Sequence, residues 1–387
     1  MSKILLLSPW PPPPDGVAFH SLALVTSWQD AGHEVLVVTS GSENALFLNP
    51  ASPNGQKIRA IRTLRLAPRR ATTQLLADFQ PDVVIVQFAI ASQSTTLLST
   101  LRLMSAAFQS GLPVVVAFHE PAREIDRLGP LSRWIYRTAA RFTTHPVVYS
   151  PAGATALRSA RIFADVAEVP LGCPLATEVS SDDLIRVRRR YTITAPLVLT
   201  LGFTHPDKGT DLLVSSIPDV TRLLDGNVQF LIAGSPRARR GVFRLMGRSD
   251  RTFHRDLTRR ANDLTAASIE VCSFVPNEDI SALLFLASAV VLPYRRSTQS
   301  SVANEALGAR AVIVASDIPE LRSDLGNAAR YFHSESISNL TETLVSVLNS
   351  SQDELRDAAA ARATGRSYDA TAAKLLDIGN FGSTSSQ

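Results

Sequence analysis

The stretch Pro293-Tyr-Arg-Arg-Ser-Thr-Gln-Ser-Ser-Val-Ala-Asn-Glu-Ala-Leu-Gly-Ala-Arg-Ala-Val-Ile-Val-Ala-Ser-Asp317 decides the fold of this chain. The apolar residues 287–292 precede it and predict a buried strand that ends at the proline. Small polar residues follow, and the pattern then predicts a helix over 302–307 and a second strand over 311–315. Strand, polar loop, helix and strand make one βαβ unit of a parallel sheet. Such sheets bind ligands at the loops that follow their strands.

Three polar residues of this unit are candidates for binding a phosphorylated ligand. Ser300 and Ser301 fall at the predicted N-terminus of the helix, where free backbone N–H groups and the helix dipole favour a phosphate. Glu305 lies about one turn further along, within reach of a neutral polar group such as a ribose hydroxyl. The alternative is an ordinary loop with a capping serine and a surface glutamate, and the stretch by itself leaves both interpretations open.

The segment over 305–322, Glu-Ala-Leu-Gly-Ala-Arg-Ala-Val-Ile-Val-Ala-Ser-Asp-Ile-Pro-Glu-Leu-Arg, resembles the donor site of glycosyltransferase family 4. That family carries two glutamates in its pattern; Glu305 matches the second, and Ser297 stands at the position of the first. Arg310 and Val312 replace the family's usual small residue and proline. The resemblance implies the GT-B fold, an α/β fold in which two Rossmann-like domains face each other across a cleft.

Length and composition favour a globular protein of two domains. At 387 residues the chain is too long for one ordinary core. Hydrophobic residues make up 45% and charged residues 19%, and no apolar run approaches the ~20 residues that span a bilayer. The first ten residues predict a strand rather than a signal peptide. Cys173 and Cys272 lie far apart without metal-ligand spacing, so we expect reduced thiols in a cytoplasm.

The chain is basic, with a formal net charge of +4 and a pI near 9.3. Such an excess can indicate nucleic acid, an anionic membrane surface or phosphorylated substrates as partners. Arginine carries the charge, and neither a lysine-rich tail nor a nucleic-acid-binding motif is present. We therefore expect phosphates and a membrane surface as partners, and no nucleic acid.

A predicted helix over 131–142 combines an apolar face with a basic one. Arg133, Arg137 and Arg141 recur at every fourth position beside Trp134. One interpretation is a solvated charge stripe next to a core stripe. The other is a basic helix that rests on anionic lipid headgroups, which would place the protein at the inner face of the membrane.

The N-terminal region predicts the opening of a Rossmann-like domain. A strand over 3–8 leads into a proline-rich loop, then a helix over 17–30 and a strand over 33–39. The loop ends at Gly16, and it resembles the family-4 loop that approaches donor and acceptor. The family usually has two adjacent glycines there, and a plain turn between strand and helix remains the alternative.

His119 directly follows a predicted strand over 114–118. Family 4 carries a histidine at this point, near the sugar and the acceptor, so the resemblance implies that His119 is the catalytic candidate. A histidine at a strand end is otherwise a capping or packing residue.

A second Rossmann-like half begins with the strand over 197–202. In the following loop Lys208 matches the family's diphosphate-binding lysine, whereas Phe203 stands where the family has an arginine. Arg295 or Arg296 is a candidate for supplying the missing charge.

The resemblance also assigns the remaining donor contacts. Backbone groups at Phe274 and Val275 would receive the nucleotide base, and Ser297 and Gln299 would lie beside the donor sugar.

We expect four parts along the chain. They are an N-terminal acceptor-side domain over 1–175, a C-terminal nucleotide-sugar donor domain over 176–365, a terminal helix over 366–378 that crosses back to the first domain, and a disordered tail over 379–387.

Together these features predict a glycosyltransferase that moves a sugar from a nucleotide-diphosphate donor to a hydroxyl group with retention of configuration. The acceptor would be a glycan, a lipid-linked molecule or a small molecule. No Asp-x-Asp motif occurs near the predicted donor loop, so neither a metal nor a cofactor beyond the donor substrate is expected. The alternative is an inactive nucleotide-sugar-binding protein on the same scaffold, because Phe203 and Ser297 depart from the family pattern.

Overall fold

The computed structural model describes residues 1–10, 16–40, 59–63, 69–90, 92–93, 96–175, 179–236, 247–264, 268–272, 275–297 and 300–381. The chain divides into two compact units, Met1–Gly172 with Arg366–Gln387, and Cys173–Gly365. Each unit contains one parallel sheet with helices on its faces, so the predicted α/β class with two Rossmann-like domains is confirmed. The units change over at 172/173, three residues before the predicted boundary.

The sheet of the first unit has the strand order β3-β2-β1-β4-β5-β6-β7, and all its pairs are parallel. Strands such as β4 are buried along their whole length, which explains their uninterrupted apolar sequences. Its strands are β1 (Lys3–Leu7), β2 (Glu34–Ser40), β3 (Arg59–Thr63), β4 (Val83–Phe88), β5 (Val114–Phe118), β6 (His145–Val148) and β7 (Ala167–Glu168). Its helices are α1 (Gly16–Asp30), α2 (Arg69–Phe79), α3 (Leu97–Gln109), α4 (Pro121–Leu128), α5 (Pro130–Ala140), α6 (Pro151–Ser159) and α15 (Tyr368–Phe381).

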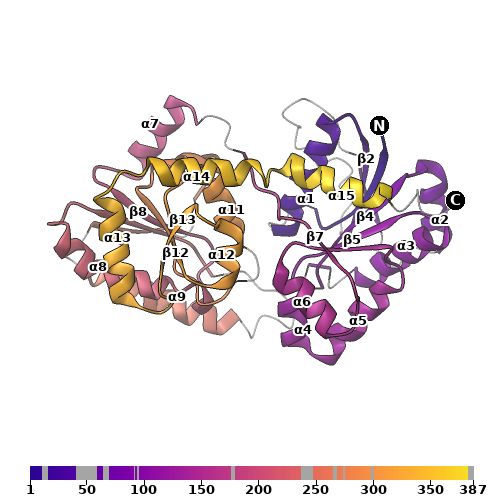
Figure 1. The fold of residues 1–387 in the computed structure, drawn as a ribbon, viewed down its shortest axis with the longest axis horizontal. Coiled ribbons are helices and arrows are strands. Elements are labelled where there is room, and N and C mark those ends of the chain that lie inside the picture. The colour runs from indigo at the N-terminus through magenta and orange to yellow at the C-terminus, as the bar shows by residue number, and fades with distance from the viewer. Residues whose placement is uncertain are drawn as a thin grey trace. The chain divides into compact units, whose positions relative to one another are not determined.

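The last helix, α15, covers one face of the first sheet beside α1 (Figure 1). The Trp28 indole Nε1 donates a hydrogen bond to the Ala372 carbonyl at 2.9 Å, and Leu375 is fully buried in the same cluster. The prediction that a tail begins at residue 379 is wrong for its first three residues, because the helix continues to Phe381. Gly379 lies so close to the Val83 side chain that an added Cβ would come within 2.9 Å of it. Residues 382–387 lie outside the described part of the chain.

The sheet of the second unit has the order β10-β9-β8-β11-β12-β13 and is also parallel. Its strands are β8 (Leu197–Leu201), β9 (Gln229–Ala233), β10 (Ser268–Cys272), β11 (Ala289–Leu292), β12 (Ile313–Ser316) and β13 (Ala329–Phe332). Its helices are α7 (Ser181–Arg190), the 3-10 turn η1 (Pro206–Lys208), α8 (Thr210–Leu223), α9 (Gly247–Asn262), α10 (Asn277–Leu286), α11 (Ser301–Gly308), α12 (Pro319–Leu325), α13 (Ile337–Leu348) and α14 (Asp353–Thr364). The predicted βαβ unit is confirmed as β11, α11 and β12.

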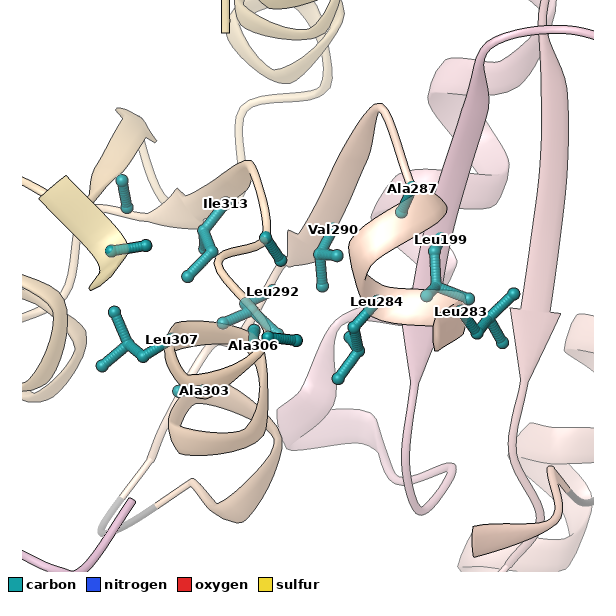
Figure 2. Close-up of a cluster of buried hydrophobic side chains, with 14 of the residues drawn as sticks. Leu199, Leu283, Leu284, Ala287, Val290, Leu292, Ala303, Ala306, Leu307 and Ile313 are labelled. Atoms are coloured by element: carbon teal, nitrogen blue, oxygen red, sulfur yellow. The ribbon is translucent and has the colours of Figure 1, made fainter. Parts of the chain in front are cut away.

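Small side chains allow α11 to pack closely on this sheet. Ala303, Ala306 and Leu307 of α11 lie against Leu292 and Ile313 in a fully buried cluster, with α10 beside them (Figure 2). At the end of the helix, a Cβ on residue 308 would overlap the Pro174 carbonyl oxygen, so only glycine fits there. The position of α11 is therefore fixed by close packing at both its middle and its end.

A glycine also joins the loops that follow β8 and β11. Gly209 has a φ of +60°, and a Cβ there would overlap the carbonyl oxygen of Pro293. The same loops share a backbone hydrogen bond, in which the Arg295 N–H donates to the Asp207 carbonyl at 2.8 Å. The two loops therefore form one structure at the carboxyl edge of the sheet.

Within the described residues, no helix is both long enough and apolar enough to cross a bilayer.

We predict that Gly209→Ala destabilises the second unit by at least about 3 kcal/mol, because the left-handed backbone and the overlap with Pro293 both penalise a side chain. Gly226→Ala is the matched control: its φ is +77°, but an added Cβ meets no atom within 4 Å. Gly226→Ala should lower the free energy of unfolding by only about 1 kcal/mol, because it introduces the strain of a left-handed backbone without a steric overlap. Urea unfolding followed by circular dichroism measures both, and equal losses in the two variants would contradict the proposed contact.

Candidate active site

Lys208 lies at the carboxyl edge of the second sheet, at the end of the turn η1 that follows β8. Its Nζ is 3.6 Å from the centre of the Tyr294 ring, and Tyr294 follows β11. β8 and β11 are neighbours at the point where the strand order reverses, which is where open α/β sheets bind ligands. The fold thus places the predicted diphosphate-binding lysine at the ligand-binding edge.

The Tyr294 hydroxyl links this lysine to the start of α11. It lies 3.1 Å from the Ser300 Oγ, which also accepts a hydrogen bond from the Ala303 N–H at 3.2 Å. Ser300 is therefore the N-cap of α11, and its buried side chain is occupied in capping the helix. Ser301 is the first helical residue and is exposed. A phosphate at this end would meet the Ser301 side chain and the first backbone N–H groups of the helix, and the Ser300 hydroxyl would contribute only indirectly.

Glu305 lies in the second turn of α11, on the same helix that Ser300 caps. Its side chain is partly buried, and this burial raises the pKa of the carboxyl group above its ordinary value. Tyr294 and Ser300 thus connect Lys208 to the helix that carries Glu305. The structure places Lys208 and the N-terminus of α11 at one edge of one sheet, and Glu305 lies in the second turn of that helix.

The remaining predicted donor residues divide into two groups. The Ser297 Oγ is buried without a hydrogen-bond partner, and Val275 is buried two residues before the first residue of α10. Phe274 and Gln299 lie outside the described residues.

Arg295 does not supply a free charge in place of the arginine that Phe203 replaces. Its guanidinium forms a two-pronged ion pair with Asp211, with both N–O distances 2.8 Å, and a further contact of 3.1 Å to Glu335. Arg296 is exposed, and Phe203 is 52% exposed at the rim of a small hollow that Lys208 and Tyr294 also line. The expectation that Arg295 could contribute its charge is therefore wrong, because that charge is already paired.

Two histidines attach the arginine-rich helix α9 to the lysine loop, and the sequence pattern did not predict this. The His254 Nδ1 lies 3.2 Å from the Thr204 Oγ1, and the His205 Nε2 lies 3.4 Å from a carboxylate oxygen of Asp250. Tyr294 was also missed, although an aromatic residue directly after the proline that ends β11 was a visible signal. These contacts hold the loop in place between β8 and α8.

In the first unit, His119 follows β5 and lies in a buried polar cluster. Its Nε2 is 2.7 Å from the Gln87 Oε1, which also accepts a hydrogen bond from the Tyr149 hydroxyl at 2.9 Å. The side chain is only 4% exposed, and burial lowers the pKa of His119 to about 3. His119 is therefore neutral at physiological pH and acts as a hydrogen-bonding group rather than as a cation.

His20 of α1 belongs to the same cluster. Its ring lies 5.6 Å from the His119 ring and 5.0 Å from that of Tyr149, both edge to face. Both of its ring nitrogens are buried without a hydrogen-bond partner, and burial, with a smaller effect of His119, lowers the pKa of His20 well below its ordinary value. The cluster also includes the Tyr368 ring at the start of α15.

Gly16 is the first residue of α1 and is exposed. An added Cβ would meet no atom within 4 Å, so packing among the described residues does not require a glycine here. Residues 11–15 of the same loop lie outside the described part.

We predict that the buried histidines make the first unit less stable in acid. The folded-state pKa of His119, about 3, lies below its ordinary value of 6.5, so below pH 6.5 the unfolded chain takes up a proton that the folded state does not. The free energy of unfolding should then fall by about 1.4 kcal/mol per pH unit for this residue, between about pH 6.5 and 3.

Urea unfolding at pH 7, 6 and 5 checks this in wild type and His119→Gln, with tryptophan fluorescence as the signal. All three tryptophans, Trp10, Trp28 and Trp134, belong to the first unit. The variant should show a shallower pH dependence, and His254→Gln in the second unit should match wild type. Identical slopes in wild type and His119→Gln would show that His119 is not held neutral.

Family models of glycosyltransferases match both halves of the chain. Residues 14–176 match the family described as Glycosyltransferase Family 4, and residues 195–350 match Glycosyl transferases group 1. No curated protein matches the sequence significantly.

Solved structures match almost the whole chain at low sequence identity. A sucrose-phosphate synthase from Thermosynechococcus elongatus has a TM-score of 0.70 and 15% identity, covering 99% of this chain and 100% of its own. Anabaena HepE, in complex with UDP, has a TM-score of 0.74 and 14% identity with the same coverage. A glycosyltransferase from Rickettsia africae has a TM-score of 0.72 and 12% identity, covering 100% of this chain and 99% of its own. These likenesses confirm the predicted GT-B fold. The two family matches, which lie one in each half of the chain, identify it as a family-4-like glycosyltransferase.

Proposed function

We propose that this glycosyltransferase moves a sugar from a nucleoside-diphosphate donor to an acceptor hydroxyl, with retention of configuration and without a metal ion. The observation that carries the proposal is the arrangement of Lys208, Tyr294 and the N-terminus of α11 at one edge of the second sheet. Anabaena HepE has been solved with UDP and with UDP-glucose, so a UDP-sugar is the first donor to test. Retention rests on the family resemblance.

The donor diphosphate is the group that this edge suits best. In the transfer, the bond from the anomeric carbon to the diphosphate oxygen breaks, the acceptor oxygen bonds to that carbon, and nucleoside diphosphate and a proton are released. Lys208 and the backbone N–H groups of α11 would stabilise the negative charge of the departing diphosphate. Because these groups supply positive charge, the proposal requires neither a metal nor a further cofactor.

The proposal assigns the remaining parts of the donor to four further residues. Glu305 would accept hydrogen bonds from the ribose, and backbone groups near Val275 would receive the base. The buried Ser297 Oγ has no partner among the described residues and is proposed to face the sugar. His119 would contact the sugar and the acceptor as a neutral hydrogen-bonding group.

A direct assay distinguishes an active transferase from the alternative, an inactive nucleotide-sugar-binding protein on the same scaffold. Wild type that binds UDP but neither transfers sugar nor hydrolyses any UDP-, GDP- or ADP-sugar would support a binding protein.

We predict that Lys208→Ala weakens UDP binding about 10- to 100-fold, because a hydrogen bond to a charged group contributes roughly 1.5–3 kcal/mol. Glu305→Ala should weaken UDP and UDP-glucose binding by similar factors, since ribose is common to both. Isothermal titration calorimetry measures both affinities.

Lys374→Ala is the matched control for Lys208, because Lys374 is an exposed lysine on α15 of the first unit. It should bind UDP as wild type does. Wild-type affinity in Lys208→Ala would contradict the donor site, as would a Glu305→Ala defect limited to the sugar nucleotide.

A second proposal concerns the surface of α5. Trp134 is 63% and Leu131 57% exposed, and Arg133, Arg137 and Arg141 are exposed beside them. Exposed tryptophan among arginines suits the interface of an anionic membrane, where the indole enters the headgroup region and guanidinium groups pair with lipid phosphates. We propose a cytoplasmic protein that rests peripherally on this surface, where it would meet a lipid-linked acceptor or a glycan.

We predict that the protein floats with phosphatidylglycerol-containing vesicles and not with phosphatidylcholine vesicles. Each basic residue near an anionic surface contributes about 1 kcal/mol, so Arg133→Ser with Trp134→Ser should lower binding at least about fivefold. Arg188→Ala with Arg189→Ala is the control, because it removes two exposed arginines of α7 and therefore one more positive charge than the α5 double variant. Equal flotation with both vesicle types, or equal loss in both double variants, would contradict the α5 surface.

A further inference from the structure

A small polar hollow lies at the carboxyl edge of the first sheet, and none of the residues assigned above lines it. It is bounded by the ends of β1 and β2 and by side chains of α2 and α3, with a volume of about 20 Å³. β1 also pairs with β4, and the strand order reverses between them, so the hollow adjoins the ligand-binding edge of this unit.

The lining of the hollow is polar but uncharged. Six buried hydroxyl-bearing residues contribute to it: Ser8, Thr39, Thr72, Thr96, Ser99 and Thr100. Leu7, Val38 and Leu103 add apolar walls. Among the described residues that line it, none is acidic or basic, so a phosphate or carboxylate placed there would lose its hydration without gaining an opposite charge.

Gln93 gives the hollow a specific chemical requirement. This residue is only 3% exposed, and its Nε2 donates a hydrogen bond to the Gln87 carbonyl oxygen at 3.0 Å. Because a carbonyl only accepts, this bond fixes which end of the amide is nitrogen. The other end, Oε1, is buried without a hydrogen-bond partner. A ligand group that satisfies Oε1 must therefore donate a hydrogen bond, which a hydroxyl does and an ionised carboxylate or the dianion of a phosphate monoester does not.

Gln87 connects this hollow to His119. The backbone carbonyl of Gln87 accepts from Gln93, and its side-chain Oε1 lies 2.7 Å from the His119 Nε2. Gln87 itself is fully buried in β4, so the two contacts are held by a rigid strand. A group bound by Gln93 is thereby positioned relative to the histidine that the proposed function places at the sugar and acceptor.

We propose that the hollow receives a hydroxyl or hydroxymethyl group of an uncharged saccharide or polyol acceptor, which donates a hydrogen bond to the Gln93 Oε1. The inference rests on the proposed function, since it names the acceptor class of that reaction. The volume suits one such group, because a site for a single water needs about 10–15 Å³. The remainder of the acceptor lies outside the hollow.

Saccharide binding tests the inference without requiring turnover. Saturation-transfer NMR on the full chain, with UDP present, compares glucose, maltose and myo-inositol with glucose 6-phosphate and inorganic phosphate. At least one uncharged compound should bind, and Gln93→Leu should weaken it about tenfold. Thr39→Val removes a hydroxyl from the hollow and keeps the β-branched shape of the strand residue, so it should fold normally and weaken binding about threefold. Gln109→Leu, the same change at an exposed position of α3, is the control and should bind as wild type does.

The outcomes separate this inference from the function on which it rests. Three outcomes, each with intact UDP affinity, would contradict the proposed acceptor class. The protein could bind only the phosphorylated compounds, or it could bind none of the compounds. It could also bind an uncharged saccharide with an affinity that neither Gln93→Leu nor Thr39→Val changes. Failure of wild type to bind any sugar nucleotide would instead overturn the proposed function. In the working enzyme, Gln93→Leu should raise the acceptor KM about tenfold. The control Gln109→Leu should leave the acceptor KM, the donor KM and acceptor-independent donor hydrolysis unchanged.

Discussion

The contact between Gly209 and the Pro293 carbonyl is the constraint on which the second unit's site depends. Only a glycine with a left-handed backbone lets the loop after β8 approach the loop after β11 this closely. The approach brings Lys208 over the Tyr294 ring, and Tyr294 then reaches the serine that caps α11. A lysine thus joins an aromatic ring and a helix terminus that lie about ninety residues further along the chain, and the three form one cationic edge. The Ala-rich face of α11 and the glycine at its end keep that terminus from shifting.

The two units have the same sheet architecture, but the residues at the carboxyl edges of their sheets differ in charge. The carboxyl edge of the second sheet presents a cation and free backbone N–H groups, which suit a diphosphate. The corresponding edge of the first sheet presents neutral hydroxyls, an amide and histidines whose burial keeps them uncharged. In the proposed function, the charge of the lining residues discriminates anionic from neutral ligands, although both edges lie at the reversal point of a parallel sheet.

The fold was largely predictable from local pattern, whereas much of the site was not. The strand before Pro293 and the helix carrying Glu305 follow from apolar runs and a capping serine, and these depend on neighbours in sequence. Three features of the site depend on residues that are distant in sequence, and hydrophobic periodicity reports only on neighbours in sequence. They are the ion pair of Arg295, the aromatic ring beneath Lys208 and the burial of His119. The terminal helix exceeded its predicted end for the same reason: Gly379 continues it because Val83 lies beneath. The roles of Lys208, Glu305 and His119 stay predictions.

The membership of α15 in the first unit has a consequence for synthesis of the chain. The second unit, Cys173–Gly365, is inserted within the first, and α15 supplies the last part of a core that begins with β1. On the ribosome the inserted unit can complete its own core first, because domains fold as their residues emerge. The part of the first sheet beside α1, and the side of α1 that carries Trp28, stay uncovered until residues 368–381 have left the exit tunnel. Chains interrupted before that point expose an apolar sheet face, which makes them substrates for chaperones and proteases.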